Sequence, residues 1–285
     1  MSAGFPFVKG HGTENDFVLL PDPDGTVHPD LDTATVAALC HRRAGIGADG
    51  VIRVVRTDAT DDPAAFAARG EATWFMDYRN ADGSLSEMCG NGVRVLARYL
   101  ADHEGVDTAA VLPIATRDGV KRITFGHDGG ITVDMGVPRV LEETKVGVGP
   151  ATWPALHVDM GNPHAVAFVD ALADAGPLHD APAYDPGSFP HGVNIEFVVR
   201  RAPAHVAFRV FERGSGETRS CGTGACAVMV AAALADGLVR PLPDEPSLTY
   251  QVDVPGGELM VTWTSDDHVL LTGPAVLVAS GTWNG

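Results

Sequence analysis

Residues 89–100 read Cys-Gly-Asn-Gly-Val-Arg-Val-Leu-Ala-Arg-Tyr-Leu, and residues 221–234 read Cys-Gly-Thr-Gly-Ala-Cys-Ala-Val-Met-Val-Ala-Ala-Ala-Leu. Apolar residues recur at helical spacing in the first stretch, and the second is almost wholly apolar and small, so both predict buried helices. Each helix follows a Cys-Gly-x-Gly pattern that places a cysteine at its N-terminus. The chain therefore contains the same loop-to-helix junction twice, once in each half.

The surroundings of the two junctions also correspond. Nine residues before each cysteine lies a polar residue, Asn80 in the first half and Glu212 in the second. An asparagine-centred element opens each half, at Asn15 and at Asn162. We therefore expect an ancient duplication and two domains, each with a cysteine at the head of its own central helix.

Short runs rich in β-branched residues predict strands between these features. The runs are residues 16–20, 51–55, 131–135, 165–169, 193–199, 205–211, 258–263 and 269–272. Helical patterns are fewer and cover residues 33–43, 90–101 and 222–234. Many strands and few helices, one of them fully apolar, predict an α/β (α+β) protein with curved sheets wrapped around central helices.

A cysteine at a helix N-terminus lies at the positive end of the helix dipole, which predicts a lowered thiol pKa. The first N–H groups of the same helix form a ready anion-binding site. Two thiols can invert a stereocentre if one removes a proton from one face and the other returns a proton to the opposite face. Cys89 and Cys221 are therefore the predicted acid/base pair, with N–H donors that would stabilise charge developing on a carboxylate.

The composition excludes several classes of partner. Lys and Arg number 20 against 37 Asp and Glu, so the formal net charge is −17. Nucleic acid and anionic membranes need basic clusters, so neither is an expected partner. The sequence has no apolar run of about 18–20 residues and no secretory signal, which predicts a cytoplasmic protein without a membrane span.

The four cysteines do not form a metal-binding pattern. None belongs to a CxxC pair, so no metal is expected. Cys40 and Cys226 lie on apolar helical stretches, where a cysteine usually packs as a small hydrophobe. Dinucleotide, P-loop and nucleophile-elbow motifs are also absent from the sequence.

Eight segments carry a resemblance to a known family. They are residues 9–17, 43–50, 80–84, 88–92, 160–164, 193–194, 212–218 and 220–225. In their order and over nearly the whole chain, they resemble diaminopimelate epimerase. The resemblance implies a cofactor-independent enzyme that interconverts LL- and meso-diaminopimelate, in the synthesis of lysine and of the peptidoglycan precursor.

The resemblance also implies an architecture. Family members have two pseudo-symmetric domains, each a curved, mostly antiparallel sheet around a central helix, with the active site in the cleft between them. Here residues 1–137 and 272–285 would form the first domain, and residues 138–271 the second. The family further implies a homodimer with a small-molecule substrate.

Roles for individual residues follow from the same resemblance. Cys89 and Cys221 would be the acid/base thiols, and His164 and Glu212 would lie beside them, position the substrate and tune their charge. Backbone N–H groups of Gly90, Asn91, Gly222 and Thr223 would hold the reacting α-carboxylate. The distal amino-acid end would be read by Asn15, Asn80, Asn162, Asn194 and Arg213.

The sequence departs from the family at one informative position. Many members have glycine just before the Asn-Asp-Phe run, where this chain has Glu14. If that turn requires a positive φ, Glu14 is strained and the placement of Asn15 is affected.

Three alternatives remain open from the residues. The first is an amino-acid racemase of the same fold with another substrate, such as proline or hydroxyproline. The second is a non-catalytic amino-acid-binding protein, which would bind diaminopimelate without isotope exchange. The third is a redox role in which the two cysteines form a reversible disulfide.

Overall fold

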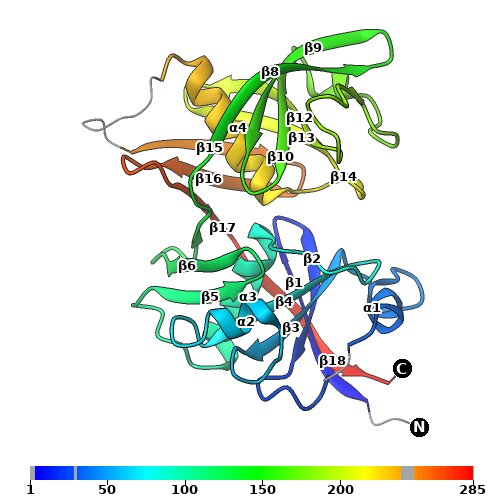
Figure 1. The fold of residues 1–285 in the computed structure, drawn as a ribbon, viewed down its shortest axis with the longest axis vertical. Helices are drawn as coiled ribbons and strands as arrows, with labels where there is room; N and C mark the ends of the chain where they lie inside the picture. Colours follow the sequence, from blue (N-terminus) through cyan, green and yellow to red (C-terminus); the bar gives the residue numbers. More distant parts are fainter. Residues whose placement is uncertain (1–3, 29–30, 239–246, 285) are drawn as a thin grey trace. The chain divides into compact units, whose positions relative to one another are not determined.

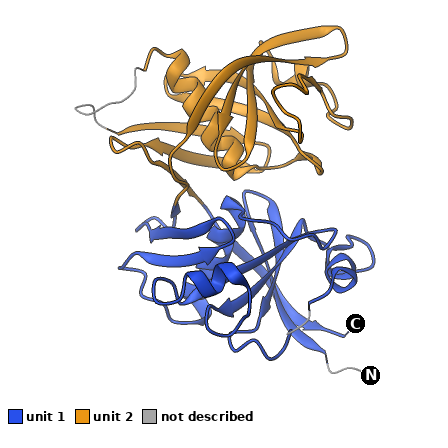
Figure 2. Ribbon diagram, in the orientation of Figure 1, with its two compact units in different colours: residues 1–133, 274–285 blue, residues 134–273 orange. Residues whose placement is uncertain are grey.

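The structure is a computed structural model that describes residues 4–28, 31–238 and 247–284. The chain divides into two compact units (Figures 1 and 2). Unit 1 comprises residues 1–133 and 274–285, and unit 2 comprises residues 134–273. The last strand of the chain thus belongs to the same unit as the first.

Unit 1 is built on a sheet with the strand order β18-β1-β2-β3-β4-β5-β6-β7. Neighbouring strands are antiparallel except for the pairs β2–β3 and β4–β5, which are parallel. The strands are β1 (Phe5–Gly12), β2 (Asn15–Pro21), β3 (Gly50–Arg56), β4 (Trp74–Asn80), β5 (Leu112–Thr116), β6 (Gly119–Phe125), β7 (Ile131–Asp134) and β18 (Val276–Trp283).

Unit 2 is built on a sheet with the order β8-β9-β10-β12-β13-β15-β16-β17. Here the parallel pairs are β10–β12 and β13–β15. The strands are β8 (Arg139–Val148), β9 (Ala151–Asp159), β10 (Pro163–Phe168), β12 (Asn194–Ala202), β13 (His205–Glu212), β15 (Leu248–Val254), β16 (Gly257–Trp263) and β17 (Val269–Gly273). The short strands β11 (Ala183–Tyr184) and β14 (Gly216–Thr218) pair with β8 and β13.

The two units share one topology. Counted in the spatial orders given above, the third and fourth strands of each sheet are parallel to each other, and so are the fifth and sixth. In each unit a 14-residue helix lies in the connection from the fifth strand to the sixth. The helix of unit 1 is α3 (Gly90–His103), and that of unit 2 is α4 (Gly222–Ala235). The predicted pseudo-symmetric α+β fold, with mostly antiparallel sheets, is therefore confirmed.

Each central helix is buried against its own sheet. In unit 1, α3 packs on strands β1, β2, β3, β4 and β18. In unit 2, α4 packs on β9, β10, β12, β13, β15, β16 and β17. Alanines, glycines and valines dominate α4, so strands can approach it from several sides and bury most of its length.

The remaining helices lie outside these cores. They are α1 (Thr33–Cys40), α2 (Pro63–Ala67) and the 3₁₀ turn Leu172–Ala175. The sequence predicts the first of them over residues 33–43, but it ends at Cys40 because the chain at His41 is extended. In the described part of the chain, no helix is long and apolar enough to cross a membrane.

All eight predicted strands are present, but ten other strands in the described part of the chain were not predicted. The missed strands are β1, β4, β5, β6, β8, β9, β11, β14, β15 and β18. Many of them lack a clear apolar run because one face is exposed. In β18 most residues are exposed, and in β8 half of them are, so strand pairing rather than a hydrophobic pattern defines these two strands.

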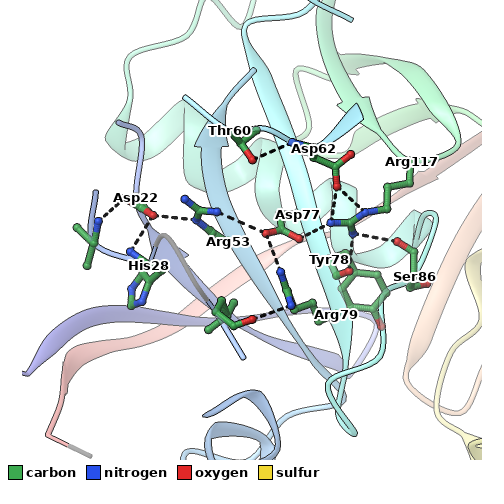
Figure 3. A network of polar contacts seen from close by, with 12 residues as sticks. Asp22, His28, Arg53, Thr60, Asp62, Asp77, Tyr78, Arg79, Ser86 and Arg117 are labelled. Atoms are coloured by element: carbon green, nitrogen blue, oxygen red, sulfur yellow. Dashed lines mark hydrogen bonds and ion pairs between the residues drawn. The ribbon is translucent and has the colours of Figure 1, made fainter. Parts of the chain in front are cut away.

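A chain of buried ion pairs runs across the sheet of unit 1 (Figure 3). Arg53 Nε lies 2.8 Å from Asp22 Oδ2, and Arg53 Nη1 lies 3.8 Å from Asp77 Oδ2. Asp77 also pairs with Arg79 at 3.6 Å and with Arg117 at 2.6 Å. Asp77 is thus a shared anion for three guanidinium groups, and only 3% of its surface is exposed.

The same network holds the segment that leads to Cys89. Arg117 Nη1 donates to the carbonyl oxygens of Tyr78 at 2.9 Å and of Ser86 at 3.3 Å. Tyr78 belongs to β4, whereas Ser86 lies three residues before Cys89. The ion pairs therefore connect the interior of the sheet to the loop that positions the helix start (Figure 3).

We expect Asp77→Asn to destabilise the protein by about 3 kcal/mol, because removal of one partner leaves buried cations without their shared counter-charge. Urea unfolding of the two proteins measures the difference. The matched control is Asp102→Asn at the exposed Arg98–Asp102 pair, for which the expected loss is about 0.5 kcal/mol or less. Equal losses for the two variants would contradict a structural role for the network.

Candidate functional site

Cys89 is the N-cap residue of α3 in unit 1. Its backbone is extended, and the helix begins at Gly90. The thiol is half-buried and donates to Asn15 Oδ1 across 3.6 Å. The first turn of an α-helix presents N–H groups that have no acceptor within the helix. The structure thus places a thiol and a set of N–H donors at one helix end, as the sequence predicts.

The asparagines of unit 1 form a connected group around this thiol. Asn91 Nδ2 donates to Asn15 Oδ1 at 3.2 Å, and Asn15 Nδ2 donates to Asp49 Oδ2 at 2.8 Å. Asn80 lies at the end of β4, where its Nδ2 donates to Ser84 Oγ at 3.0 Å. Cys89, Asn15 and Asn91 are therefore together, whereas Asn80 belongs to the neighbouring turn.

Arg94 is a site neighbour that sequence reasoning missed. It is completely buried one turn into α3. Its Nη1 donates to the carbonyl of Gly90 at 3.2 Å, and its Nη2 donates to Asn91 Oδ1 at 2.9 Å. The guanidinium therefore fixes the first turn of the helix, including the side chain of Asn91.

The turn that precedes Asn15 carries the strain expected from the sequence. It connects β1 to β2, and Thr13 and Glu14 have φ values of 48° and 61°. A left-handed backbone costs a residue with a side chain about 1–2 kcal/mol relative to glycine. Asn15 nevertheless begins β2 opposite Gly12 and is nearly buried, so its position is defined by strand pairing.

Cys221 is the N-cap residue of α4 in unit 2 and differs from Cys89 in its contacts. Its sulfur accepts a hydrogen bond from the Gly224 N–H at 3.3 Å and lies 3.5 Å from Thr223 Oγ1. Only 6% of the residue is exposed. The close approach depends on Gly224, because a Cβ there would lie 3.2 Å from the sulfur.

The expected lowering of the thiol pKa is wrong for Cys221. Burial raises its pKa well above the ordinary value, and the carboxylates of Glu212 and Glu196 raise it further. The hydrogen bonds from Thr223 and from the Gly224 N–H act in the opposite direction but do not compensate. Cys221 is therefore a neutral thiol near neutral pH, because desolvation outweighs the helix end.

His164 lies in a buried hydrogen-bonded chain in unit 2. Its Nδ1 is 2.6 Å from Glu196 Oε1, and its Nε2 is 2.9 Å from Asn162 Oδ1. His164 and Glu196 are both completely buried. Glu196 is a second residue that sequence reasoning missed. The available signal was a single carboxylate within the apolar run of residues 193–199, which is typical of a strand buried on both faces.

The other predicted residues of unit 2 gather where β12 begins and β13 ends. Asn194 Oδ1 accepts from the Arg213 N–H at 2.9 Å, and Asn194 Nδ2 donates to the Pro163 carbonyl at 3.3 Å. Glu212 accepts a hydrogen bond from Thr218 Oγ1. The exposed Arg213 donates from Nη1 to the carbonyl of His191 at 3.1 Å.

Each unit thus assembles its own half of the predicted set. Unit 1 contains Cys89, Gly90, Asn91, Asn15 and Asn80. Unit 2 contains the remaining members, namely Cys221, Gly222, Thr223, Asn162, His164, Asn194, Glu212 and Arg213. Asn15 lies two residues before Phe17, which pairs with the first residue of β3. Asn162 lies two residues before His164, which pairs with the first residue of β12. The two asparagines therefore occupy equivalent positions in the two units.

The four cysteines are free thiols. Cys40 and Cys226 are buried, as expected for packing residues, and burial raises the pKa of Cys40 to about 11. Within the described ranges, no cluster of His, Cys, Asp and Glu has the arrangement of a metal site. Cys89 and Cys221 can transfer protons as thiols, and each lies at a helix end suited to binding a carboxylate.

Comparisons with known proteins give one consistent family. The family model of diaminopimelate epimerase matches residues 7–141 and 156–278. The diaminopimelate epimerase of Streptomyces coelicolor is 56% identical, covering 99% of this chain and 96% of that protein. The diaminopimelate epimerase of Thermobifida fusca is 48% identical, covering 96% of each chain.

Solved structures with low sequence identity share the fold. A phenazine biosynthesis protein of the PhzF family from Bacillus anthracis has a TM-score of 0.73 at 15% identity, covering 99% of each chain. A hydroxyproline epimerase from Agrobacterium vitis, with bound trans-4-hydroxy-L-proline, has a TM-score of 0.66 at 15% identity, covering 99% of this chain and 92% of that one.

Glu212→Gln is expected to lower the pKa of Cys221, because it removes a negative charge that opposes the thiolate while keeping an oxygen for the Thr218 hydroxyl. The thiolate fraction at neutral pH should therefore rise. Ultraviolet absorbance of the thiolate across a pH titration measures the change, with Cys221→Ser as the blank. Glu217→Gln, a neighbouring exposed carboxylate, is the matched control. A titration midpoint that stays in place or moves upward would contradict this electrostatic coupling.

Proposed function

Since the chain belongs to the diaminopimelate epimerase family, we propose that it interconverts LL- and meso-diaminopimelate with two cysteine thiols and no cofactor. The observation that carries this proposal is the repeated helix start. Cys89 caps α3 and Cys221 caps α4, in two units of identical strand order. A two-base reaction needs two such groups, each presented at the end of a rigid element.

The proposed reaction is a proton exchange at one carbon. One sulfur, as thiolate, takes the proton from the α-carbon, and the electron pair of the broken C–H bond moves into the α-carboxylate. The electron pair then returns to the α-carbon and takes a proton from the other sulfur, a thiol on the opposite face, which becomes the thiolate. The charge balance of the protein is unchanged, but the thiolate has moved to the other cysteine, and the reverse reaction uses the same groups in exchanged roles.

The developing carbanion is stabilised by the helix ends. Its extra charge lies on the α-carboxylate oxygens, where donors that are already oriented need no rearrangement during the reaction. The backbone N–H groups of Gly90, Asn91, Gly222 and Thr223 are the proposed donors. Loss of one such donor typically costs about 3 kcal/mol of transition-state stabilisation.

The distal end of the substrate requires a different set of groups. It carries one ammonium and one carboxylate, and asparagine side chains offer both an acceptor and donors without adding net charge. We propose Asn15, Asn80, Asn162, Asn194 and Arg213 for this task. Arg213 is exposed and presents a planar guanidinium that suits bidentate pairing with a carboxylate.

His164 and Glu212 are proposed to support the acid/base pair. Glu212 contributes to the raised pKa of Cys221. It therefore favours the state in which Cys221 is the proton donor. The His164 ring is held at both nitrogens and serves to orient Asn162.

The cellular setting is also a proposal. Family resemblance and four free thiols support a cytoplasmic enzyme that supplies lysine and peptidoglycan precursors. Family resemblance alone supports a homodimer. Sedimentation equilibrium of the purified chain tests the latter, and the mass of a single chain would reject it.

The central experiment is an epimerase assay in D₂O with cysteine variants. Cys89→Ala and Cys221→Ala should each lower kcat by about 10²–10⁴-fold, the usual contribution of a general acid or base. The wild-type product should carry deuterium at the α-carbon. Cys40→Ala, which removes a buried packing thiol, is the control and should keep its activity.

The same assay separates the alternatives. Retained turnover in either single cysteine variant would reject the two-thiol mechanism. Diaminopimelate binding without isotope exchange would indicate a binding protein. Equal turnover of proline or hydroxyproline would indicate a racemase of another specificity. The 56% identity to a diaminopimelate epimerase favours the proposed substrate over these alternatives.

A further inference from the structure

Glu196 is a buried carboxyl group to which neither the sequence motifs nor the mechanism above gives a task. It lies on β12 between Val166 of β10 and Val210 of β13, and none of its surface is exposed. Its Oε1 contacts His164 Nδ1 at 2.6 Å. Its Oε2 is buried and has no hydrogen-bond partner among the described residues. A buried carboxylate with one unsatisfied oxygen is costly unless its charge is compensated.

The contacts of the His164 ring indicate where the compensating proton lies. Nε2 faces the amide oxygen of Asn162, which can only accept, so Nε2 carries a hydrogen. Nδ1 faces a carboxyl oxygen at 2.6 Å, a separation that needs a proton between the two atoms. The pair therefore holds one proton more than a neutral imidazole and a free carboxylate. With that proton, His164 and Glu196 carry no net charge together.

The pair lies at the start of α4. A Cβ on Gly224 would lie 2.8 Å from Glu196 Oε1 and 3.2 Å from Cys221 Sγ. Both atoms thus border the same small space beside the helix N-terminus. The carboxylate of Glu196 is one of the two that raise the pKa of Cys221, so the Glu196–His164 pair and the thiol are electrostatic neighbours.

We propose that Glu196 is a positioning residue for the reaction, an inference that rests on the function proposed above. It retains the shared proton on the imidazole, and the Nε2–H then binds the amide oxygen of Asn162. The Asn162 NH₂ group is thereby directed away from the ring, as a donor for a carboxylate of the substrate. Without Glu196, a neutral His164 can lose the Nε2 hydrogen, and the amide of Asn162 can turn over.

The proton count is measured directly by ¹H–¹⁵N NMR of the unliganded wild-type protein with labelled histidine, with signals of His164 assigned by their loss in His164→Asn. We expect two exchangeable protons connected to this ring, one on Nε2 and one shared by Nδ1 and Glu196. In Glu196→Gln only the Nε2 proton should remain, because the Gln amide can itself donate to Nδ1. A wild-type ring without a proton on Nε2 would overturn the proposal, as would a Glu196→Gln spectrum identical to the wild type.

Kinetics test the positioning role. Glu196→Leu should raise the KM for diaminopimelate about tenfold, the equivalent of one buried hydrogen bond, and should change kcat much less. Glu196→Gln should restore most of the loss. Glu143→Leu, on the exposed face of β8, is the matched control with an unchanged KM. A KM for Glu196→Leu equal to that of the control would overturn the proposal.

The proposed function and the role of Glu196 can be rejected independently. If the wild-type protein does not epimerise diaminopimelate, the proposed function fails, while the NMR measurement still decides the proton on His164. If Glu196→Leu does not fold, the wild-type and Glu196→Gln spectra decide the proposal without it.

Discussion

Each unit depends on one packing constraint, which is that a curved sheet closes over a single helix. The apolar face of the sheet must be buried, and one 14-residue helix fills the available space in each unit. In α4 this requires small side chains, because seven strands pack against the helix. The helix can then begin only where the sheet ends. Its first N–H groups and its N-cap cysteine are therefore presented at the margin of the core instead of within it.

The N-cap thiols of the two helices have different surroundings. The thiol of Cys89 is half-buried and contacts the amide oxygen of Asn15. The thiol of Cys221 is buried and accepts from the first turn of its own helix. The proposed acid/base pair does not need identical surroundings, because in the proposed mechanism one sulfur starts as proton donor while the other starts as proton acceptor. The raised pKa of Cys221 suits the proposed donor role.

The sequence was informative where chemistry and periodicity coincide. The Cys-Gly-x-Gly junctions mark both helix starts, and the apolar runs mark the central strands of the units. Strands with one exposed face, such as β8 and β18, could not be recognised, because they lack a continuous apolar run. In addition, β18 pairs with β1 at the opposite end of the sequence. Arg94 and Glu196 were missed for a related reason. A charged side chain inside an apolar pattern signals burial, but its partner is known only once the strands are paired.

The pKa of Cys221 is a second property that the sequence pattern could not predict. The local rule for a helix N-terminus predicts a lowered value, yet two carboxylates from β12 and β13 and the loss of solvent reverse it. Tertiary contacts therefore decide the sign of the shift, and a motif alone gives only the location of the group.

A cysteine that acts as an acid or base is also open to oxidation. Peroxides attack the thiolate form and convert it to sulfenic and then sulfinic acid. The raised pKa of Cys221 keeps its thiol neutral, and only 6% of the residue is exposed. The burial that raises the pKa of this thiol therefore also lowers its susceptibility to oxidation.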